Sequence, residues 1–172
     1  MLKPEEVELQ AKRKEDENFA FRTFLKINAD EQKLDKQFLK LHKELFKDYD
    51  CSKCRNCCTK YAGTIPEEDL RKDAAKLGRS VKGFIKQYLK PEMDFDGNYS
   101  TLHVPCDFLS EDGSCILEDC KPESCKKYPY TDQPERLQSM LSVLDVVIVC
   151  PVAFEILEQL KEEYGYRYRR KR

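Results

Sequence analysis

The chain has no tryptophan, only two histidines among its 172 residues, and no excess of either charge. Its net charge of −1 provides no global field that would attract nucleic acid or a membrane surface. Hydrophobic residues make up 40% of the sequence, which suffices for a core, but the lack of tryptophan indicates a small one. We therefore expect bound metal or crosslinks to help hold the fold.

Sequence signals of several common functions are also missing. The first six residues contain no apolar stretch of the kind found in secretory signals, and no apolar run reaches the roughly 18 residues of a membrane span. Neither a G-x-G-x-x-G motif nor a P-loop is present, so no nucleotide site is expected. Neither histidine flanks the main cysteine cluster, which gives a Cys–His nucleophile little support. These absences predict a cytoplasmic protein that is not expected to bind membranes or nucleic acid.

Cysteine, in contrast, is abundant. Four of the nine cysteines fall within eight residues, in the run Cys51-Ser-Lys-Cys54-Arg-Asn-Cys57-Cys58. The other five lie in the second half: Cys106, Cys115, Cys120, Cys125 and Cys150. In a reducing cytosol disulfides do not persist, so such a pattern favours metal binding over a disulfide framework or thiol redox chemistry. The odd number of cysteines also argues against a fully paired set.

The spacing of the first cluster suits a metal site. Cysteines two residues apart can reach one metal around a tight turn, so Cys51, Cys54 and Cys57 offer three ligands from one loop. Bacterial ferredoxins use this spacing together with a remote cysteine that is followed by proline. Cys150, which precedes Pro151, is the candidate for that remote ligand.

The adjacency of Cys57 and Cys58 suggests more than one metal site. In an extended chain neighbouring side chains point to opposite faces, so the pair suits two adjacent sites or a bridged cluster. Cys58 and any three of Cys106, Cys115, Cys120 and Cys125 would complete a second four-sulfur site. His103, which precedes Cys106 by three residues, is a weaker candidate.

The rest of the chain is mostly helical in pattern. We expect a helix over residues 4–27, and a second one from an Asp30 cap to about residue 45, which together form a hairpin. Thr64 and Glu67 have the spacing of a capping box, and Ser80 is expected to cap a helix that ends at Pro91. A loop over residues 91–100 and a short strand over 101–104 should follow.

The second half predicts a long irregular segment followed by helices. Residues 105–134 contain too many Cys, Pro, Gly and Asp residues for long regular elements, residues 136–149 fit a helix slightly better than a strand, and Pro151 opens a clear helix. The predicted fold class is mainly α, with a small α+β fold as the alternative: an N-terminal helical hairpin plus a compact metal-stapled, cysteine-rich domain with long loops. The predicted limits are a helical arm at 1–48, the cysteine domain at 49–160 and a charged tail at 161–172.

Several segments, taken together in order and spacing, resemble a known family, the bacterial CxxCxxCC (YkgJ-like) cysteine-cluster proteins, which are described as zinc- or iron-chelating. The matching segments are Cys51-x2-Cys54-x2-Cys57-Cys58, Pro105-Cys106-x-Phe108-Leu109, Gly113-x-Cys115, Lys121-Pro122-x2-Cys125 and Cys150-Pro151. The resemblance spans about residues 50–155. It implies metal-binding roles for Cys51, Cys54, Cys57, Cys58, Cys106, Cys115, Cys125 and Cys150. Cys120 is not part of the pattern.

The leading functional prediction is a cysteine-cluster metal-binding protein that holds zinc or iron, an iron–sulfur cluster such as [4Fe-4S] being one form of the iron. One alternative is an enzyme or enzyme subunit whose cluster supports redox or protein-modification chemistry. The resembling cluster occurs in flagellin lysine methylases, but this chain lacks their length and any visible methyl-donor site. The other alternative is an adaptor with a purely structural zinc site, which binds a protein partner through its N-terminal helices.

Overall fold

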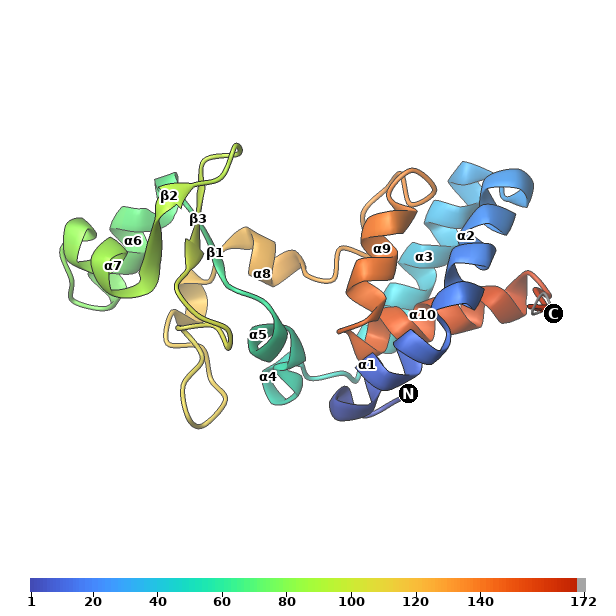
Figure 1. The fold of residues 1–172 in the computed structure, drawn as a ribbon, viewed down its shortest axis with the longest axis horizontal. Coiled ribbons are helices and arrows are strands. Elements are labelled where there is room, and N and C mark those ends of the chain that lie inside the picture. The colour runs from blue at the N-terminus through green and yellow to red at the C-terminus, as the bar shows by residue number, and fades with distance from the viewer. Residues whose placement is uncertain (170–172) are drawn as a thin grey trace. The chain divides into compact units, whose positions relative to one another are not determined.

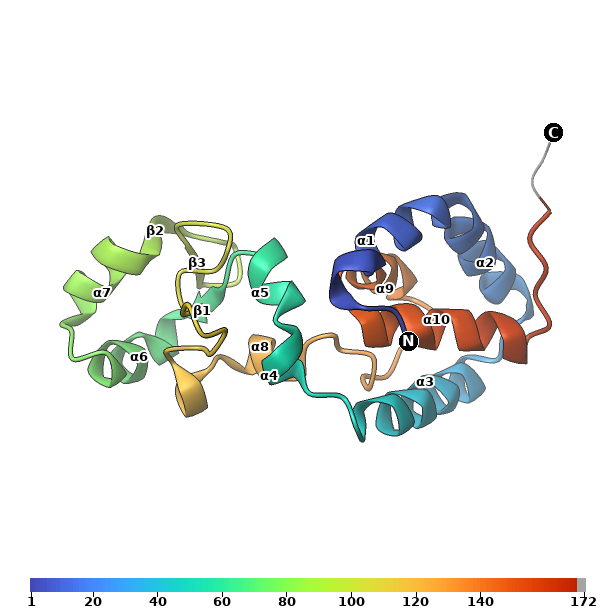
Figure 2. The ribbon, with the colours of Figure 1, turned by 90° about the horizontal axis from the view of Figure 1, so that it is seen from below.

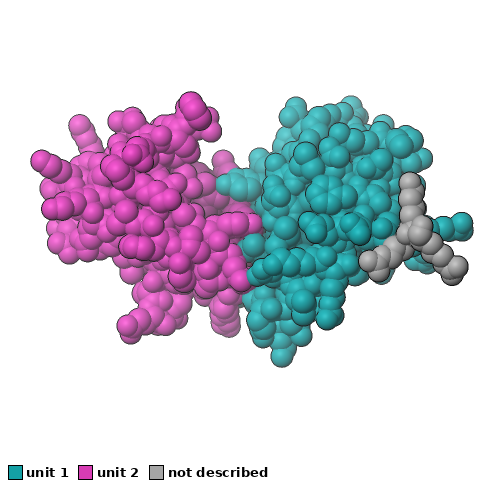
Figure 3. All heavy atoms as spheres, in the orientation of Figure 1, with its two compact units in different colours: residues 1–50, 129–172 teal, residues 51–128 magenta. Residues whose placement is uncertain are grey.

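The computed structural model describes residues 1–169, which form two compact units (Figure 3). Unit 1 combines residues 1–50 with the chain from Pro129 onward, and unit 2 consists of Cys51–Tyr128. The last three residues of the predicted basic tail lie outside the described residues. None of the helices in residues 1–169 combines the length and apolar character needed to cross a lipid bilayer. The mainly helical class with a small sheet is confirmed; the predicted domain limits stay a prediction.

Unit 1 is a helical assembly around its last helix (Figures 1 and 2). Its helices are α1 (Pro4–Arg13), α2 (Glu15–Asn28), α3 (Glu31–Phe46), α9 (Met140–Val147) and α10 (Pro151–Glu163). Helix α10 packs against α1, α3 and α9, and Figure 2 shows it between α3 on one side and α1 and α9 on the other. Its long apolar stripe explains this position, because it presents buried residues to all three neighbours.

The N-terminal helices match the sequence-based prediction with one correction. Instead of one helix over residues 4–27, the chain breaks at Lys14, which ends α1 and begins α2. The break allows α1 to pack on α10 while α2 packs on α9, and the amine of Lys14 forms an ion pair with Glu158 of α10. The Asp30 cap is confirmed, since its carboxylate accepts a hydrogen bond from the Lys33 amide at 2.8 Å.

A buried lysine joins α10 to α2. The amine of Lys161 donates to Asn18 Oδ1 at 2.6 Å and lies 2.7 Å and 2.9 Å from carboxylate oxygens of Glu158 and Glu17. The Lys161 side chain is only 5% exposed, so these three partners compensate a charge that burial would otherwise penalise strongly. The ion pairs therefore fix how the two helices meet.

Unit 2 contains a three-stranded antiparallel sheet with the order β1-β3-β2. Its strands are β1 (Thr64–Pro66), β2 (Leu89–Met93) and β3 (Asn98–Thr101). Its other elements are α4 (Cys51–Cys54), α5 (Asn56–Lys60), η1 (Glu67–Asp69), α6 (Leu70–Lys76), α7 (Val81–Tyr88), η2 (Glu118–Cys120) and α8 (Glu123–Lys127). Most of the segment between β3 and η2 lacks regular structure, as predicted.

Three local predictions in unit 2 are wrong because strand pairing overrides them. Thr64 does not cap a helix; it pairs with Ser100, and α6 begins only at Leu70, after the η1 turn. The predicted loop over residues 91–100 instead holds most of β2 and β3, and the edge strand β2 accommodates Pro91 where its register with β3 shifts. The strand expected over 101–104 ends at Thr101. The Ser80 cap is confirmed by a bond from the Gly83 amide.

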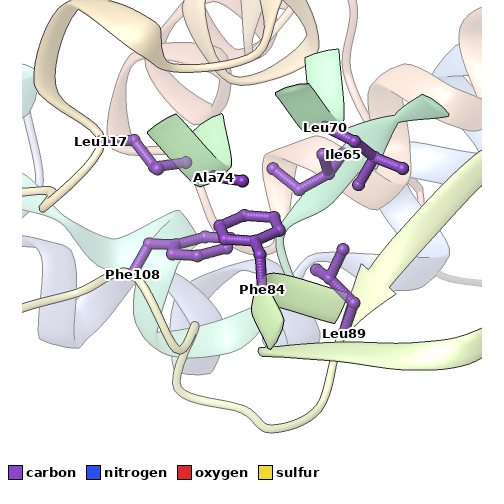
Figure 4. Packing of buried hydrophobic residues seen from close by; sticks show 7 residues of the cluster. All are labelled: Ile65, Leu70, Ala74, Phe84, Leu89, Phe108 and Leu117. Atoms are coloured by element: carbon purple, nitrogen blue, oxygen red, sulfur yellow. The ribbon is translucent and has the colours of Figure 1, made fainter. Parts of the chain in front are cut away.

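The core of unit 2 joins the sheet and helices to the irregular segment (Figure 4). The rings of Phe84 in α7 and Phe108 in the irregular segment are nearly parallel, with centroids 5.7 Å apart. The remaining buried members of this cluster are Ile65, Leu70, Ala74, Leu89 and Leu117. Since Phe108 lies two residues after Cys106, the core fixes the position of the cysteines that follow β3.

One carboxylate in unit 2 is buried without compensation. Asp73 of α6 is fully buried, and among the described residues neither of its carboxylate oxygens has a hydrogen-bond partner. Desolvation raises the pKa of Asp73 to about 6, although the nearby charges of Lys72 and Lys126 oppose the shift. The folded state therefore binds this proton more tightly than the unfolded chain does.

We predict that Asp73→Asn stabilises the protein at alkaline pH but not at acid pH. Because folding raises the pKa of Asp73, protonation of its carboxyl group favours the folded state. This stabilisation is fully present below about pH 4 and is lost as the pH rises through about 6. The variant should raise the free energy of unfolding by about 1–3 kcal/mol at pH 8, with little change at pH 4, as measured by urea unfolding. Exposed Asp96→Asn serves as the control. A loss of stability at pH 8 would mean that the Asp73 carboxylate has a partner in solution.

Candidate metal centre

The first four cysteines lie on two short helices that are separated by one unusual residue. Arg55 follows α4 and precedes α5 with a left-handed φ of 51°, and its Nε donates to the Ser52 carbonyl at 2.8 Å. Cys57 and Cys58 therefore belong to a helical turn, in which neighbours are about 100° apart rather than on opposite faces. Their sulfurs are 3.9 Å apart. The expectation that the two side chains point to opposite faces of an extended chain is therefore corrected.

The segment after β3 is tied directly to this motif. The Cys106 amide donates to the Cys58 carbonyl at 2.8 Å, which places the two cysteines side by side. The chain then folds back, since the Ile116 amide bonds to the Phe108 carbonyl and Leu109 forms an antiparallel bridge with Cys115. These backbone contacts bring Cys115 back toward Cys106. Three cysteines from distant parts of the sequence thus come close together.

Gly63 allows this close approach. A Cβ atom at this position would lie 2.9 Å from Cys106 Sγ and 3.0 Å from Thr101 Cγ2. The Gly63 amide donates to Thr101 Oγ1 at 2.8 Å, so the backbone is held against the sulfur. Sequence reasoning missed this residue, although a glycine immediately before a strand is a signal for close backbone contact.

Electrostatic interactions define a larger set, the six-thiol group. Cys57 interacts with Cys54, Cys58 and Cys125. Cys106 interacts with Cys58 and Cys115, and Cys125 of α8 interacts with Cys58, Cys106 and Cys115. Helices α5 and α8 lie next to one another in both views (Figures 1 and 2). The members of the group are Cys54, Cys57, Cys58, Cys106, Cys115 and Cys125.

The vicinal pair shares a proton unequally. Cys57 keeps its proton and donates to the Cys58 sulfur, which raises the pKa of Cys57 and lowers that of Cys58 to about 6. The positive charges of Arg55 and Lys121 lower the pKa of Cys58 further. Desolvation, with the charges of neighbouring thiols, raises the pKa of Cys106 and brings that of Cys125 to about 11. Cys58 is therefore the member of the vicinal pair that ionises first in the metal-free protein.

The remaining sequence candidates are Cys51, Cys120, Cys150 and His103. Cys51 is exposed on α4, and Cys150 is buried in unit 1 as the residue that precedes α10. Cys120 packs at the edge of the unit 2 core and interacts with Lys72 of α6. The side chain of His103 is 72% exposed, and its Nδ1 lies 2.7 Å from a carboxylate oxygen of Asp107. His103 thus turns outward to a carboxylate, and it follows the strand rather than belonging to it.

The six-thiol group has suitable donors for a metal but does not hold them at ligand distances. All six members of the group are free thiols. Within residues 1–169, no three His, Cys, Asp or Glu side chains converge closely enough to hold a metal ion. Soft thiolates select zinc, copper(I) or iron–sulfur clusters, so the chemistry of the donors fits zinc or iron. Binding would require the segments that carry these sulfurs to draw together.

Comparison with protein families agrees with this chemistry. The model of the CxxCxxCC family, described as a putative zinc- or iron-chelating domain, matches residues 50–145. Since the match covers more than half of the chain, the protein belongs to this family. Searches of curated proteins and of solved structures found no match.

We predict that Gly63→Ala weakens both the fold and metal retention. The added methyl group would overlap Cys106 Sγ and Thr101 Cγ2, which should lower the free energy of unfolding by about 1–3 kcal/mol. Metal should also pass faster to a competing chelator. Gly83→Ala is the matched control, because its Cβ would approach only Ser80 Oγ, at 3.1 Å. Equal chelator kinetics for the two variants would contradict the close-approach role of Gly63.

We also predict that alkylation distinguishes the thiols of the metal-free protein. At pH 7 Cys58 is mostly thiolate and Cys125 mostly thiol, so iodoacetamide should modify Cys58 at least about 10-fold faster. Peptide mass spectrometry gives both rates in one sample. Cys57→Ala removes the S–H donor and should move the pH profile of Cys58 upward. An unchanged profile in that variant would show that Cys57 does not set the pKa of Cys58.

Proposed function

We propose that this protein binds zinc or iron through the thiolates of the six-thiol group, with Cys51 and Cys150 as further candidate ligands. The observation that carries the proposal is the assembly of thiols from three separate parts of the sequence: the α4–α5 motif, the segment around Cys106 and Cys115, and α8. Family membership supports the same chemistry. Cys120 and His103 are not included, because Cys120 interacts with Lys72 and His103 faces Asp107.

The metal has at least a structural role in this proposal. Between β3 and Tyr128 the only helices are η2 and α8, of three and five residues. A segment with so little regular structure gains order if its sulfurs share a metal with α4 and α5, since site formation and folding are coupled. Free thiols such as those of the six-thiol group persist in a reducing compartment, so we place the protein in the cytoplasm.

The charges in and around the six-thiol group favour its metal-bound state over a metal-free state with ionised sulfurs. Burial opposes ionisation of the grouped thiols and repulsion from neighbouring thiols adds to it, so the pKa of Cys106 and of Cys125 is raised. A divalent ion removes this repulsion by binding the sulfurs directly, and it needs them deprotonated. Arg55 and Lys121, which interact with Cys58, offset the negative charge that a thiolate-rich site retains.

The deciding measurement is the metal and acid-labile sulfide content, with an absorbance spectrum, of full-length protein purified without oxygen. Zinc without sulfide would identify closed structural sites, whereas brown protein with roughly four irons and four sulfides per cluster would identify an iron–sulfur centre and favour redox or enzyme-support roles. Chelation should lower the free energy of unfolding by several kcal/mol. Cys120→Ser is the matched control for replacement of Cys57 or Cys106, and it should keep the metal. Protein that takes up neither metal would refute the proposal.

A further inference from the structure

Helix α3 has a row of lysines along one side. At alternating steps of three and four residues, the row consists of Lys33, Lys36, Lys40, Lys43 and Lys47. A turn of about 100° per residue keeps all five within an arc of about 80°, along about 21 Å of helix axis. Lys47, which caps the end of α3, has helical backbone angles and so continues the row. We call these five residues the lysine row.

The lysine row is exposed and its charge is not compensated within the fold. None of the five amines forms an ion pair or a hydrogen bond with a residue that the structure describes. Lysines on other helices do form such pairs, for example Lys12 with Glu8 and Lys72 with Asp69. Like charges three and four residues apart repel one another and destabilise a helix. The row therefore lowers the stability of α3 in the absence of an anionic partner.

The opposite face of α3 is already occupied. Leu34, Phe38 and Leu41 are buried, and α3 packs against α10. Figure 2 shows α3 at the edge of unit 1, which leaves the side with the lysine row open to a partner. We propose that the lysine row binds the phosphate backbone of double-stranded DNA without selecting its base sequence. This inference goes beyond metal binding and does not depend on it.

The charge and shape of the lysine row match a linear polyanion. The two strands of DNA together have one negative charge per about 1.7 Å of helix axis, so a row of this length meets more phosphates than it has amines. Lysine binds phosphate as a point charge, whereas arginine and amide side chains distinguish bases by paired hydrogen bonds. A row built from lysine alone therefore positions a duplex but does not select a sequence.

Other anionic partners fit this face less well. A helix that binds a lipid surface inserts its apolar face, but the apolar face of α3 is buried in unit 1. Single-stranded nucleic acid stacks its bases on aromatic side chains, and among the residues of α3, all of them described, the exposed large apolar side chain is Leu39. Lysine is depleted in protein interfaces, whereas interfaces with DNA are strongly positive.

The overall composition conceals this local charge. The net charge of −1 averages the lysine row with acidic residues elsewhere in the chain. On α3 itself Glu31 and Asp35 are half-buried, and Asp35 accepts hydrogen bonds from the Glu135 and Arg136 amides, so Glu44 is the exposed acidic residue of this helix. At physiological salt a surface charge acts over about 8 Å, so a partner in contact meets the row rather than the average. The expectation drawn from net charge therefore does not extend to this face.

The test measures the affinity of full-length protein for a fluorescently labelled DNA duplex of mixed sequence over a range of salt concentrations. Each lysine that neutralises a phosphate contributes about −0.9 to the slope of log K against log salt concentration. Lys36→Gln/Lys40→Gln/Lys43→Gln should therefore weaken binding and make the slope shallower by about 3. Glutamine has nearly the helix propensity of lysine, so α3 should persist, and circular dichroism checks this.

The matched control is Lys82→Gln/Lys86→Gln/Lys90→Gln, which removes the same charge from exposed positions of unit 2. This variant should keep the slope within about 1 of the wild type. Equal effects of the two triple variants would overturn the proposal, because binding would then follow net charge. Wild-type protein that does not bind the duplex would overturn it as well. Tighter binding of single-stranded DNA, duplex RNA or anionic lipid vesicles would assign the row to that partner instead of duplex DNA.

Discussion

Burial of grouped thiols, which opposes their ionisation, is the constraint on which the cysteine unit depends. The contacts that gather the sulfurs are made by other groups: the Cys106 amide on the Cys58 carbonyl, Gly63 against Cys106, and Phe108 stacked on Phe84. These contacts keep the sulfurs near one another, while burial first and neighbouring thiols second raise the pKa of Cys106 and Cys125 and keep both protonated. A bound metal would replace the protons and draw the sulfurs into one site.

The two units solve the problem of a small core in different ways. Unit 1 buries one face of each of several long helices around α10 and adds the buried Lys161 ion pairs. Unit 2 has short elements, a three-stranded sheet and a core of few residues, so it has less apolar area with which to offset chain entropy. Metal binding would add stability to such a unit.

The local rules of the sequence succeeded where a structural feature depends on neighbours along the chain. Asp30 and Ser80 cap their helices, because each makes its contact within a few residues. Thr64 has an equally local signal, yet it pairs with Ser100 in the sheet. Pairing of segments that are distant in the sequence can outweigh a cap worth about 1 kcal/mol.

The sequence by itself determined the donors: nine cysteines, their spacing, membership of a metal-chelating family, and the helical class. Only the tertiary structure decided which thiols are neighbours. It brought six of them together, placed Cys120 at the edge of the unit 2 core and turned His103 toward Asp107. Spacing along the chain limits which ligands one turn can supply, but contacts between turns arise from core packing and backbone hydrogen bonds. Those contacts have no signature within any single segment.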